Sequence, residues 1–290
     1  MIPTHITCPF DQWGIDIVGK LPNGTGQKKF IIVAVEYFTK WVEAEAVATI
    51  TEKRVIDFVW KNIVCRFGIP RILVAYNGAQ FSGRRMKEWC QDHKIEQRFT
   101  SVGYPQANGQ TEATNKTIIA NLQKRLTEER RGWVEQLDGV LWAYRTTART
   151  STQETPFGLV YGSESIIPAE IAVETIRIQG YSPADNHFSR VHDLDTLETV
   201  RSDALARTMN YQSIMARSYN KHVQQRDIQV GDLVLRRADI LKKVGKFQPN
   251  WEGPYKVIQV HKNGSYDLTD PFGRELNRTW NGKNLHKYNP

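Results

Sequence analysis

The chain has 290 residues, of which 40% are hydrophobic, enough to build the cores of two or three domains. Its net charge of +8 favours a polyanionic partner, although a basic soluble protein without such a partner has the same charge. No stretch approaches the roughly 18 consecutive apolar residues of a membrane span, and no targeting signal is recognised at the N-terminus. The three cysteines are widely spaced and form no Cys-x-x-Cys pair, which argues against a disulfide scaffold or a cysteine zinc site.

The first 147 residues alternate strands and helices in the manner of an α/β domain with a mixed sheet. In chain order we predict strands over 12–18, 28–38 and 39–47, a helix over 51–67, a strand over 71–75, a helix over 83–94, a strand over 95–99, a long helix from near Glu112 and a helix over 133–146. The first helix begins with a capping-type Thr51 and stops at Gly68, before Pro70.

The rest of the chain changes character twice. After a connector that contains Pro and Gly, a long polar helix is expected from about Ser189 to Val223. Its apolar residues keep an imperfect three-to-four spacing, so we expect it to pack on one side or to pair. From Gln229 to Pro290, short strands separated by Gly, Asn-Gly and Asp-Pro turns are typical of a small β-barrel. Residues 221–290 hold 13 Lys and Arg against 7 Asp and Glu, so much of the positive charge lies at this end.

Three residues in the first domain raise a chemical question. Asp16 stands inside an apolar strand, where a carboxylate is costly without a partner or a metal. Glu112 begins a long helix, where it would also complement the helix dipole. Tyr76 ends the fourth strand, at an edge where a carboxylate would be placed to bind a metal. The tyrosine is either an ordinary loop residue or the replacement of a catalytic acid.

A resemblance to a known family follows from motifs along almost the whole chain. They are WGIDIVG, YFTKWVEA, RFGIP, NGAQF, YPQANGQTEATN, WAYRTT, TPFGLVYG and WEGPYKV, in this order. The chain resembles the integrase region of gypsy-class LTR retrotransposon polyproteins, in plant-like form. The resemblance implies an α/β fold: a ribonuclease-H-like core over 1–160 with a mixed five-stranded sheet and flanking helices, a connector and long helix over 161–225, and an SH3-like DNA-binding barrel over 226–290.

The resemblance also implies an active site of two aspartates and a glutamate that hold two Mg²⁺ or Mn²⁺ ions. The first aspartate maps to Asp16, and the glutamate, 35 intervening residues after the second aspartate, maps to Glu112. Counting back from Glu112 reaches Tyr76, where the family has an aspartate. A phenol has a pKa of about 10 and is neutral at pH 7. We therefore expect weak metal binding and a large loss of activity, unless a nearby acid such as Asp92 substitutes.

DNA is the partner that the resemblance implies, and a homo-oligomer is expected on the same ground. The residues expected to face DNA are Gln106, Asn108, Gln110, Asn115, Lys116, Arg236, Arg237 and Lys256. Arg145 could meet a phosphate, although a salt bridge on a helix surface is the simpler reading. The family's site of action is the nucleus. His5 and Cys8 do not make the family's N-terminal zinc module, and we expect the chain to be a piece of a polyprotein or a decayed copy.

Three functional hypotheses remain open. The first is an integrase-type protein that keeps its fold and its DNA affinity but has a broken metal triad. The second is an active polynucleotidyl transferase, whose metal binding survives on Asp16, Glu112 and water. The third is a non-enzymatic module that binds DNA or assembles through its helix and barrel. Catalysis separates the second hypothesis from the other two.

Overall fold

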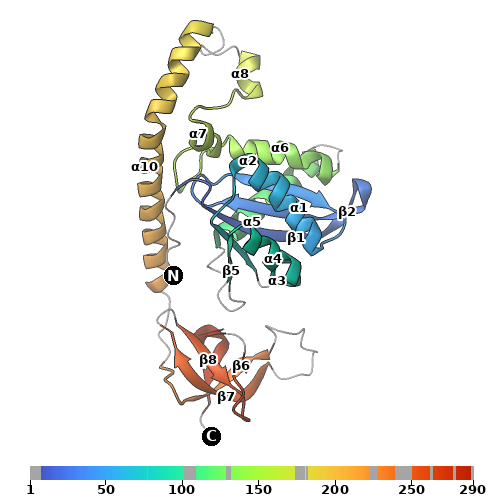
Figure 1. Ribbon diagram of the computed structural model, residues 1–290, viewed down its shortest axis with the longest axis vertical. Coiled ribbons are helices and arrows are strands. Elements are labelled where there is room, and N and C mark those ends of the chain that lie inside the picture. Colours follow the sequence, from blue (N-terminus) through green and yellow to red (C-terminus); the bar gives the residue numbers. More distant parts are fainter. Residues whose placement is uncertain are drawn as a thin grey trace. The chain divides into compact units, whose positions relative to one another are not determined.

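The computed structural model of the chain describes residues 8–76, 78–100, 109–128, 132–173, 180, 182–221, 227–238, 250–261, 264–276 and 279–288 (Figure 1). It divides into two compact units. The core unit holds the described residues up to Arg98 and those from residue 109 to Met215. The C-terminal unit holds Phe99, Thr100 and the described residues from Ala216 onward.

The core unit is built on a five-stranded mixed sheet with the strand order β3-β2-β1-β4-β5. The strands are β1 (Gln12–Gly24), β2 (Lys28–Glu36), β3 (Val42–Val47), β4 (Ile72–Tyr76) and β5 (Glu96–Thr100), and a short 3₁₀ turn, η1 (Thr25–Gln27), joins β1 to β2. β1 pairs antiparallel with β2 and parallel with β4, and β2 pairs antiparallel with β3. Three meandering strands followed by two that arrive after helices are the arrangement that the sequence predicts.

Helices cover both faces of this sheet, as Figure 1 shows. They are α1 (Glu52–Val59), η2 (Trp60–Val64), α2 (Cys65–Phe67), α3 (Ala79–Ser82), α4 (Arg84–Asp92), α5 (Gly109–Glu128) and α6 (Trp133–Arg145). One face of the sheet forms a core with α1 and α4, through Trp13, Ile15, Val55, Phe58 and Met86. The other face packs against α5 and α6, through Ile31, Val33, Ile118, Leu122, Leu137 and Val140. Because side chains alternate along a strand, β1 sends Trp13 and Ile15 to the first core and leaves Gly14 and Asp16 on the α5 side.

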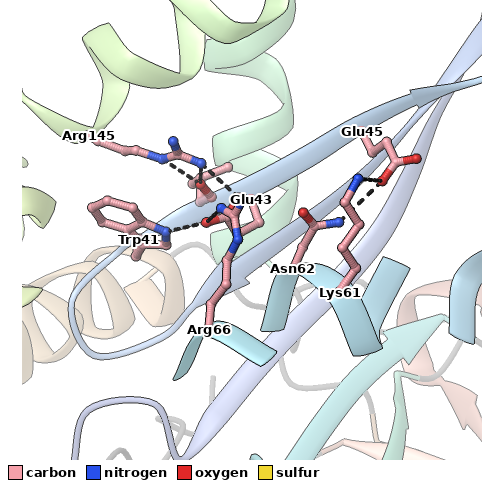
Figure 2. Close-up of polar contacts among 8 residues, drawn as sticks. Trp41, Glu43, Glu45, Lys61, Asn62, Arg66 and Arg145 are labelled. Carbon is pink, nitrogen blue, oxygen red and sulfur yellow. Dashed lines mark hydrogen bonds and ion pairs between the residues drawn. The ribbon is translucent and has the colours of Figure 1, made fainter. Parts of the chain in front are cut away.

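The helix predicted over 51–67 is continuous but not uniform. Thr51 caps it, since the Thr51 side chain accepts a hydrogen bond from the Arg54 backbone N–H at 3.2 Å. Its middle, η2, is a π-helical turn, and the helix ends at Gly68, whose φ of +91° favours glycine. The wider turn faces β3: Asn62 Nδ2 donates to Glu45 Oε2 at 3.3 Å, and Lys61 Nζ lies 4.0 Å from the same oxygen (Figure 2).

A buried carboxylate on β3 ties the two helical layers to the sheet. Glu43 accepts hydrogen bonds from Trp41 Nε1, Arg66 and Arg145, each at 2.9 Å (Figure 2). Arg145 also donates twice to the Val42 carbonyl oxygen, and its guanidinium lies 4.6 Å from the Trp41 ring centroid. The salt bridge expected for Arg145 is therefore present, but it is mostly buried and does not lie on the helix surface. A guanidinium engaged in this way holds α6 on β3.

Three further helices follow among the described residues after α6. They are α7 (Pro156–Tyr161), α8 (Pro168–Val173) and α10 (Pro183–Lys221), whose last residues belong to the C-terminal unit. The sequence predicted α10 from Ser189, but it begins at Pro183, where the Ser182 hydroxyl accepts from the Asp185 N–H and proline suits the first turn. α10 packs on one side, as expected: Arg201 donates to the Leu159 carbonyl oxygen at 3.0 Å. None of the described helices is long and apolar enough to cross a membrane.

The C-terminal unit contains a five-stranded antiparallel sheet with the order β10-β6-β7-β8-β9. The strands are β6 (Leu233–Arg237), β7 (Trp251–Val260), β8 (Ser265–Thr269), β9 (Trp280–Asn281) and β10 (Leu285–Lys287), with a 3₁₀ turn, η5 (Gly282–Asn284), before the last. Its core consists of Ile228, Val234, Val257, Tyr266, Leu268, Trp280 and Leu285. Short strands around one small apolar core fit the predicted barrel-like domain.

Candidate active site

The sheet and α5 bring the three candidate residues together. β1 and β4 run in parallel, and their last paired residues are Gly14 and Val74. Asp16 and Tyr76 each lie two positions further along, so they stand at the same level and on the same face of the sheet. That face is the one covered by α5, whose first turn contains Glu112. The convergence that the family resemblance implies is therefore present in the structure.

The side chains of this site are joined by hydrogen bonds. The Tyr76 hydroxyl donates to Glu112 Oε1. Asn115, one turn further along α5, donates from Nδ2 to Asp16 Oδ2 at 2.7 Å. The Ile17 backbone N–H donates to Asp16 Oδ1 at 2.8 Å. Both Asp16 oxygens thus have a donor, and one Glu112 oxygen is covered by the phenol.

Burial dominates the electrostatics of the site. The pKa of Asp16 is raised from 3.8 to about 6, mainly by desolvation and also by the nearby Glu112 carboxylate, against the hydrogen bonds from Ile17 and Asn115. The pKa of Tyr76 is raised far above its ordinary value, first by burial and then by the hydrogen bond to Glu112 and the charges of both carboxylates. Tyr76 is therefore a neutral donor throughout the physiological range. It cannot supply the anionic oxygen that a hard cation needs.

A close approach between β1 and α5 makes this geometry possible. A Cβ atom on Gly14 would lie 2.3 Å from Thr111 Oγ1 and 2.5 Å from the Tyr37 ring. Only glycine leaves room for both groups, and the contact brings the first turn of α5 onto the strand that holds Asp16. The sequence gives one signal for this contact, a glycine inside an apolar strand two residues before a buried acid, but a glycine alone does not identify its partner.

The donor set does not fit a two-metal centre. The site offers two carboxylates. The third position holds a phenol, which donates a hydrogen bond to one of them. Within the described ranges, no group of three His, Cys, Asp or Glu side chains is placed to hold a metal ion. Asp92, the possible substitute, is exposed at the end of α4. Mg²⁺ requires near-octahedral oxygen ligands, and this arrangement supplies them incompletely.

The residues expected to face DNA near this site are engaged in different ways. Gln106 and Asn108 lie outside the described residues. Asn115 is buried and uses its amide on Asp16, while Gln110 accepts from Lys40 Nζ at 3.0 Å. Lys116 is exposed and is therefore available to a phosphate.

The three barrel residues also differ. Arg236 donates to Glu252 Oε1 at 2.6 Å, and its guanidinium lies 4.6 Å from the Tyr255 ring centroid and 4.8 Å from that of Trp280. This arginine is built into the barrel wall. Arg237 and Lys256 are exposed on β6 and β7, and they are the members of this set that lie open to solvent.

Comparison with known proteins agrees with this fold. Residues 6–105 match the integrase core domain. This segment contains β1, β4 and the positions of Asp16 and Tyr76. Residues 228–288, which form the barrel-like sheet, match a second family model described as a domain of unknown function.

A curated relative and two solved structures extend the likeness. The Transposon Tf2-3 polyprotein of Schizosaccharomyces pombe is 24% identical over 289 residues, which cover 97% of this chain but only 21% of that polyprotein. The chain thus spans about a fifth of the length of the relative. The cryoEM structure of the simian T-cell lymphotropic virus intasome, in complex with the PP2A regulatory subunit B56 gamma, covers 100% of this chain and 84% of its own, with a TM-score of 0.59 and 15% identity. The HTLV-2 integrase catalytic core domain in complex with magnesium covers 51% of this chain and 95% of its own, with a TM-score of 0.43 and 19% identity.

The intasome likeness confirms the predicted fold class. The mixed five-stranded sheet with flanking helices resembles that of a retroviral integrase, and the second, antiparallel sheet fits a C-terminal barrel-like domain. At 15% identity this likeness concerns the fold alone. The chemistry at the site has to be argued from the residues that this chain carries.

Proposed function

We propose that this chain is an integrase-type DNA-binding protein of a gypsy-class LTR retrotransposon, in plant-like form, whose phosphoryl-transfer site is disabled by Tyr76. An intact site of this kind would process 3′ ends of DNA and transfer strands with two divalent metal ions. The match of residues 6–105 to the integrase core domain supports the class of protein. The contact between Tyr76 and Glu112 carries the proposal of a disabled site.

The proposal rests on what each side chain can offer a metal ion. Asp16 and Glu112 supply two carboxylates, which would hold Mg²⁺ or Mn²⁺ weakly. Tyr76 blocks one oxygen of Glu112 by donating to it, and its own raised pKa keeps the phenol neutral. When bound, a metal pair would activate the attacking oxygen and stabilise the leaving oxygen. The site as it stands lacks the third carboxylate for that task.

DNA binding is the activity that the rest of the chain retains in this proposal. The net charge of +8 and the exposed Lys116, Arg237 and Lys256 favour contacts with phosphates. Such contacts position DNA without reading its sequence, so binding should be weakly specific and strongly dependent on salt. We further propose that the chain acts on DNA in the nucleus and assembles as a homo-oligomer.

The disabled site is tested by restoring the carboxylate. Tyr76→Asp is compared with the unchanged chain and with Tyr76→Phe, which frees Glu112 without adding a ligand. We expect Tyr76→Asp to bind Mn²⁺ measurably tighter by calorimetry than either of the other two. Strand transfer on a duplex that bears the element's own ends should rise by about a thousandfold or more, because a barrier change of several kcal/mol has that effect.

Two further variants make each result decisive. Asp16→Asn added to Tyr76→Asp should abolish both metal binding and strand transfer. Strand transfer by the unchanged chain that Asp16→Asn abolishes would overturn the proposal and support an active transferase.

For DNA binding, the affinity should fall at least about tenfold between 50 and 200 mM salt, since released counterions drive it. An affinity that does not change with salt would contradict the electrostatic account.

A further inference from the structure

The turn between β2 and β3 contains a buried lysine that reaches the helix carrying Glu112. Lys40 is 5% exposed, and its Nζ donates to the Tyr37 carbonyl oxygen at 2.6 Å and to Gln110 Oε1 at 3.0 Å. Gln110 lies two residues before Glu112 in the first turn of α5. The contact joins residues 70 positions apart in the sequence, so it fixes one element against another.

A second contact from the same turn reaches the next residue of α5. The Tyr37 phenol and the Thr111 hydroxyl both lie within 2.5 Å of the place that a Cβ on Gly14 would take. Of the two residues that precede Glu112, Gln110 is therefore hydrogen-bonded to the β2–β3 turn and Thr111 lies close to Tyr37. Residues 37–40 thus contact the first turn of α5, and we call these residues the seat.

The seat itself is rigid. Glu36 is fully buried, and its carboxylate accepts from the backbone N–H groups of Phe38 and Thr39 and from the Thr39 hydroxyl, at 2.6–2.9 Å. Lys40 adopts a φ of +65°, which is unfavourable for a residue with a side chain. A turn fixed by three hydrogen bonds to one carboxylate holds Lys40 in that conformation and aims its side chain at α5.

Stability alone does not explain a lysine at this place. Its ammonium is buried, and it lies at the N-terminal end of α5, where the helix dipole is itself positive. Burial lowers the pKa of Lys40 to about 8 in spite of the Glu36 charge, which shows that the ammonium is poorly accommodated. A methionine would fill similar space without these costs. What the lysine adds is two hydrogen bonds, one to the Tyr37 carbonyl oxygen within the turn and one to Gln110 on α5.

We propose that Lys40 is a positioning residue, which holds the first turn of α5 through Gln110 and so sets Glu112 opposite Asp16. The proposal rests on the proposed function for the role of Glu112, but the contact itself can be tested without metal or DNA. Lys40 does not touch the reacting groups. Its effect reaches Glu112 through Gln110, which belongs to the same helical turn.

The first test is hydrogen exchange on the full chain. The backbone amides of Ala113–Lys116 bond to the carbonyl oxygens of residues 109–112, so their exchange reports opening of the first turn of α5. Lys40→Met should speed the exchange of these amides about tenfold or more and leave the amides of α6 unchanged. Lys61→Met, which removes an exposed lysine paired only at 4.0 Å, is the matched control and should change neither region.

The second test measures metal affinity in the Tyr76→Asp background. Lys40→Met should weaken Mn²⁺ binding by about tenfold, as the loss of an outer support of a metal ligand does. Gln110→Ala should do the same, and the two changes together should cost little more than one, because they break the same contact. Gln110→Ala also keeps the test decisive if Lys40→Met fails to fold.

Each outcome has one meaning. Unchanged exchange at Ala113–Lys116 in both Lys40→Met and Gln110→Ala overturns the positioning role. Faster exchange throughout the core unit also overturns it, since Lys40 would then support the fold as a whole. Faster exchange confined to α5, in a chain whose Tyr76→Asp variant binds no metal, supports the seat and refutes the proposed metal site. Additive losses in the double variant would show that Lys40 does not act through Gln110.

Discussion

Asp16 is expected to destabilise the metal-free protein at neutral pH, and this loss of stability can be measured. Burial raises the Asp16 pKa from 3.8 to about 6, so the folded chain favours the neutral carboxyl group. As far as this residue is concerned, the free energy of unfolding is highest below about pH 4 and falls as the pH rises through 6. One pKa unit corresponds to about 1.4 kcal/mol, and the shift of about two units therefore sets an upper limit near 3 kcal/mol. Because the side chain keeps some contact with solvent, we expect about 1–3 kcal/mol.

Asp16→Asn removes the charge and keeps the shape. The repulsion from Glu112 disappears, but the single amide oxygen can accept from Asn115 or from the Ile17 N–H and not from both. The variant should therefore be more stable than the unchanged chain by at most about 2 kcal/mol near pH 7.5, since the lost hydrogen bond offsets part of the gain, and the gain should vanish near pH 4. Urea unfolding followed by tryptophan fluorescence at several pH values measures the difference.

The control is Asp11→Asn. Asp11 pairs with the exposed Arg71 through two hydrogen bonds of 2.9 and 2.7 Å, so its removal should cost up to about 1 kcal/mol at neutral pH. The two variants are thus expected to differ in sign. Asp16→Asn that destabilises the chain near pH 7.5, or a gain that does not depend on pH, would refute the burial argument.

Two other substitutions test contacts that shape the site. Gly14→Ala should lower the free energy of unfolding by about 1–3 kcal/mol, because its methyl group would meet Thr111 and force α5 off the strand. Gly132→Ala, whose methyl group meets only a movable carboxylate, should cost less than about 1 kcal/mol, and equal losses would contradict the close approach. Glu43→Gln should cost about 2–4 kcal/mol in urea unfolding, since it leaves a mostly buried guanidinium without its counter-charge. Glu45→Gln, which affects a long and exposed ion pair, should cost less than about 1 kcal/mol.

The architecture of the core unit could be predicted because its signals are local. The mostly apolar run of β1, the cap at Thr51 and the stop at Gly68 each act within a few residues, and the structure has all three. The convergence of Asp16, Tyr76 and Glu112 was expected from the family resemblance, and strand alternation together with the start of α5 accounts for it in the structure. The short helices α7 and α8 were missed, since each spans only about two turns within a connector rich in Pro and Gly.

Contacts between distant segments could not be predicted. Nothing local in the sequence indicates that Lys40 reaches Gln110, because a lysine in a turn is normally solvated. Arg236 was expected to face DNA by the family resemblance, whereas its guanidinium lies against Glu252 and two aromatic rings. In both cases burial, which depends on the whole fold, decides what a charged side chain does.

In the proposed function, Tyr76 has opposite effects on metal binding and on the stability of the metal-free chain. An aspartate at this place would put a third carboxylate beside Asp16 and Glu112, and the three charges would repel one another without a metal. The tyrosine adds no charge and donates a hydrogen bond to Glu112, so an oxygen of this partly buried carboxylate has a partner. The tyrosine thus leaves the site without a third carboxylate and lowers its electrostatic cost. Tyr76→Asp should accordingly gain metal affinity and lose stability in the metal-free state, and the stability should return when Mn²⁺ is added.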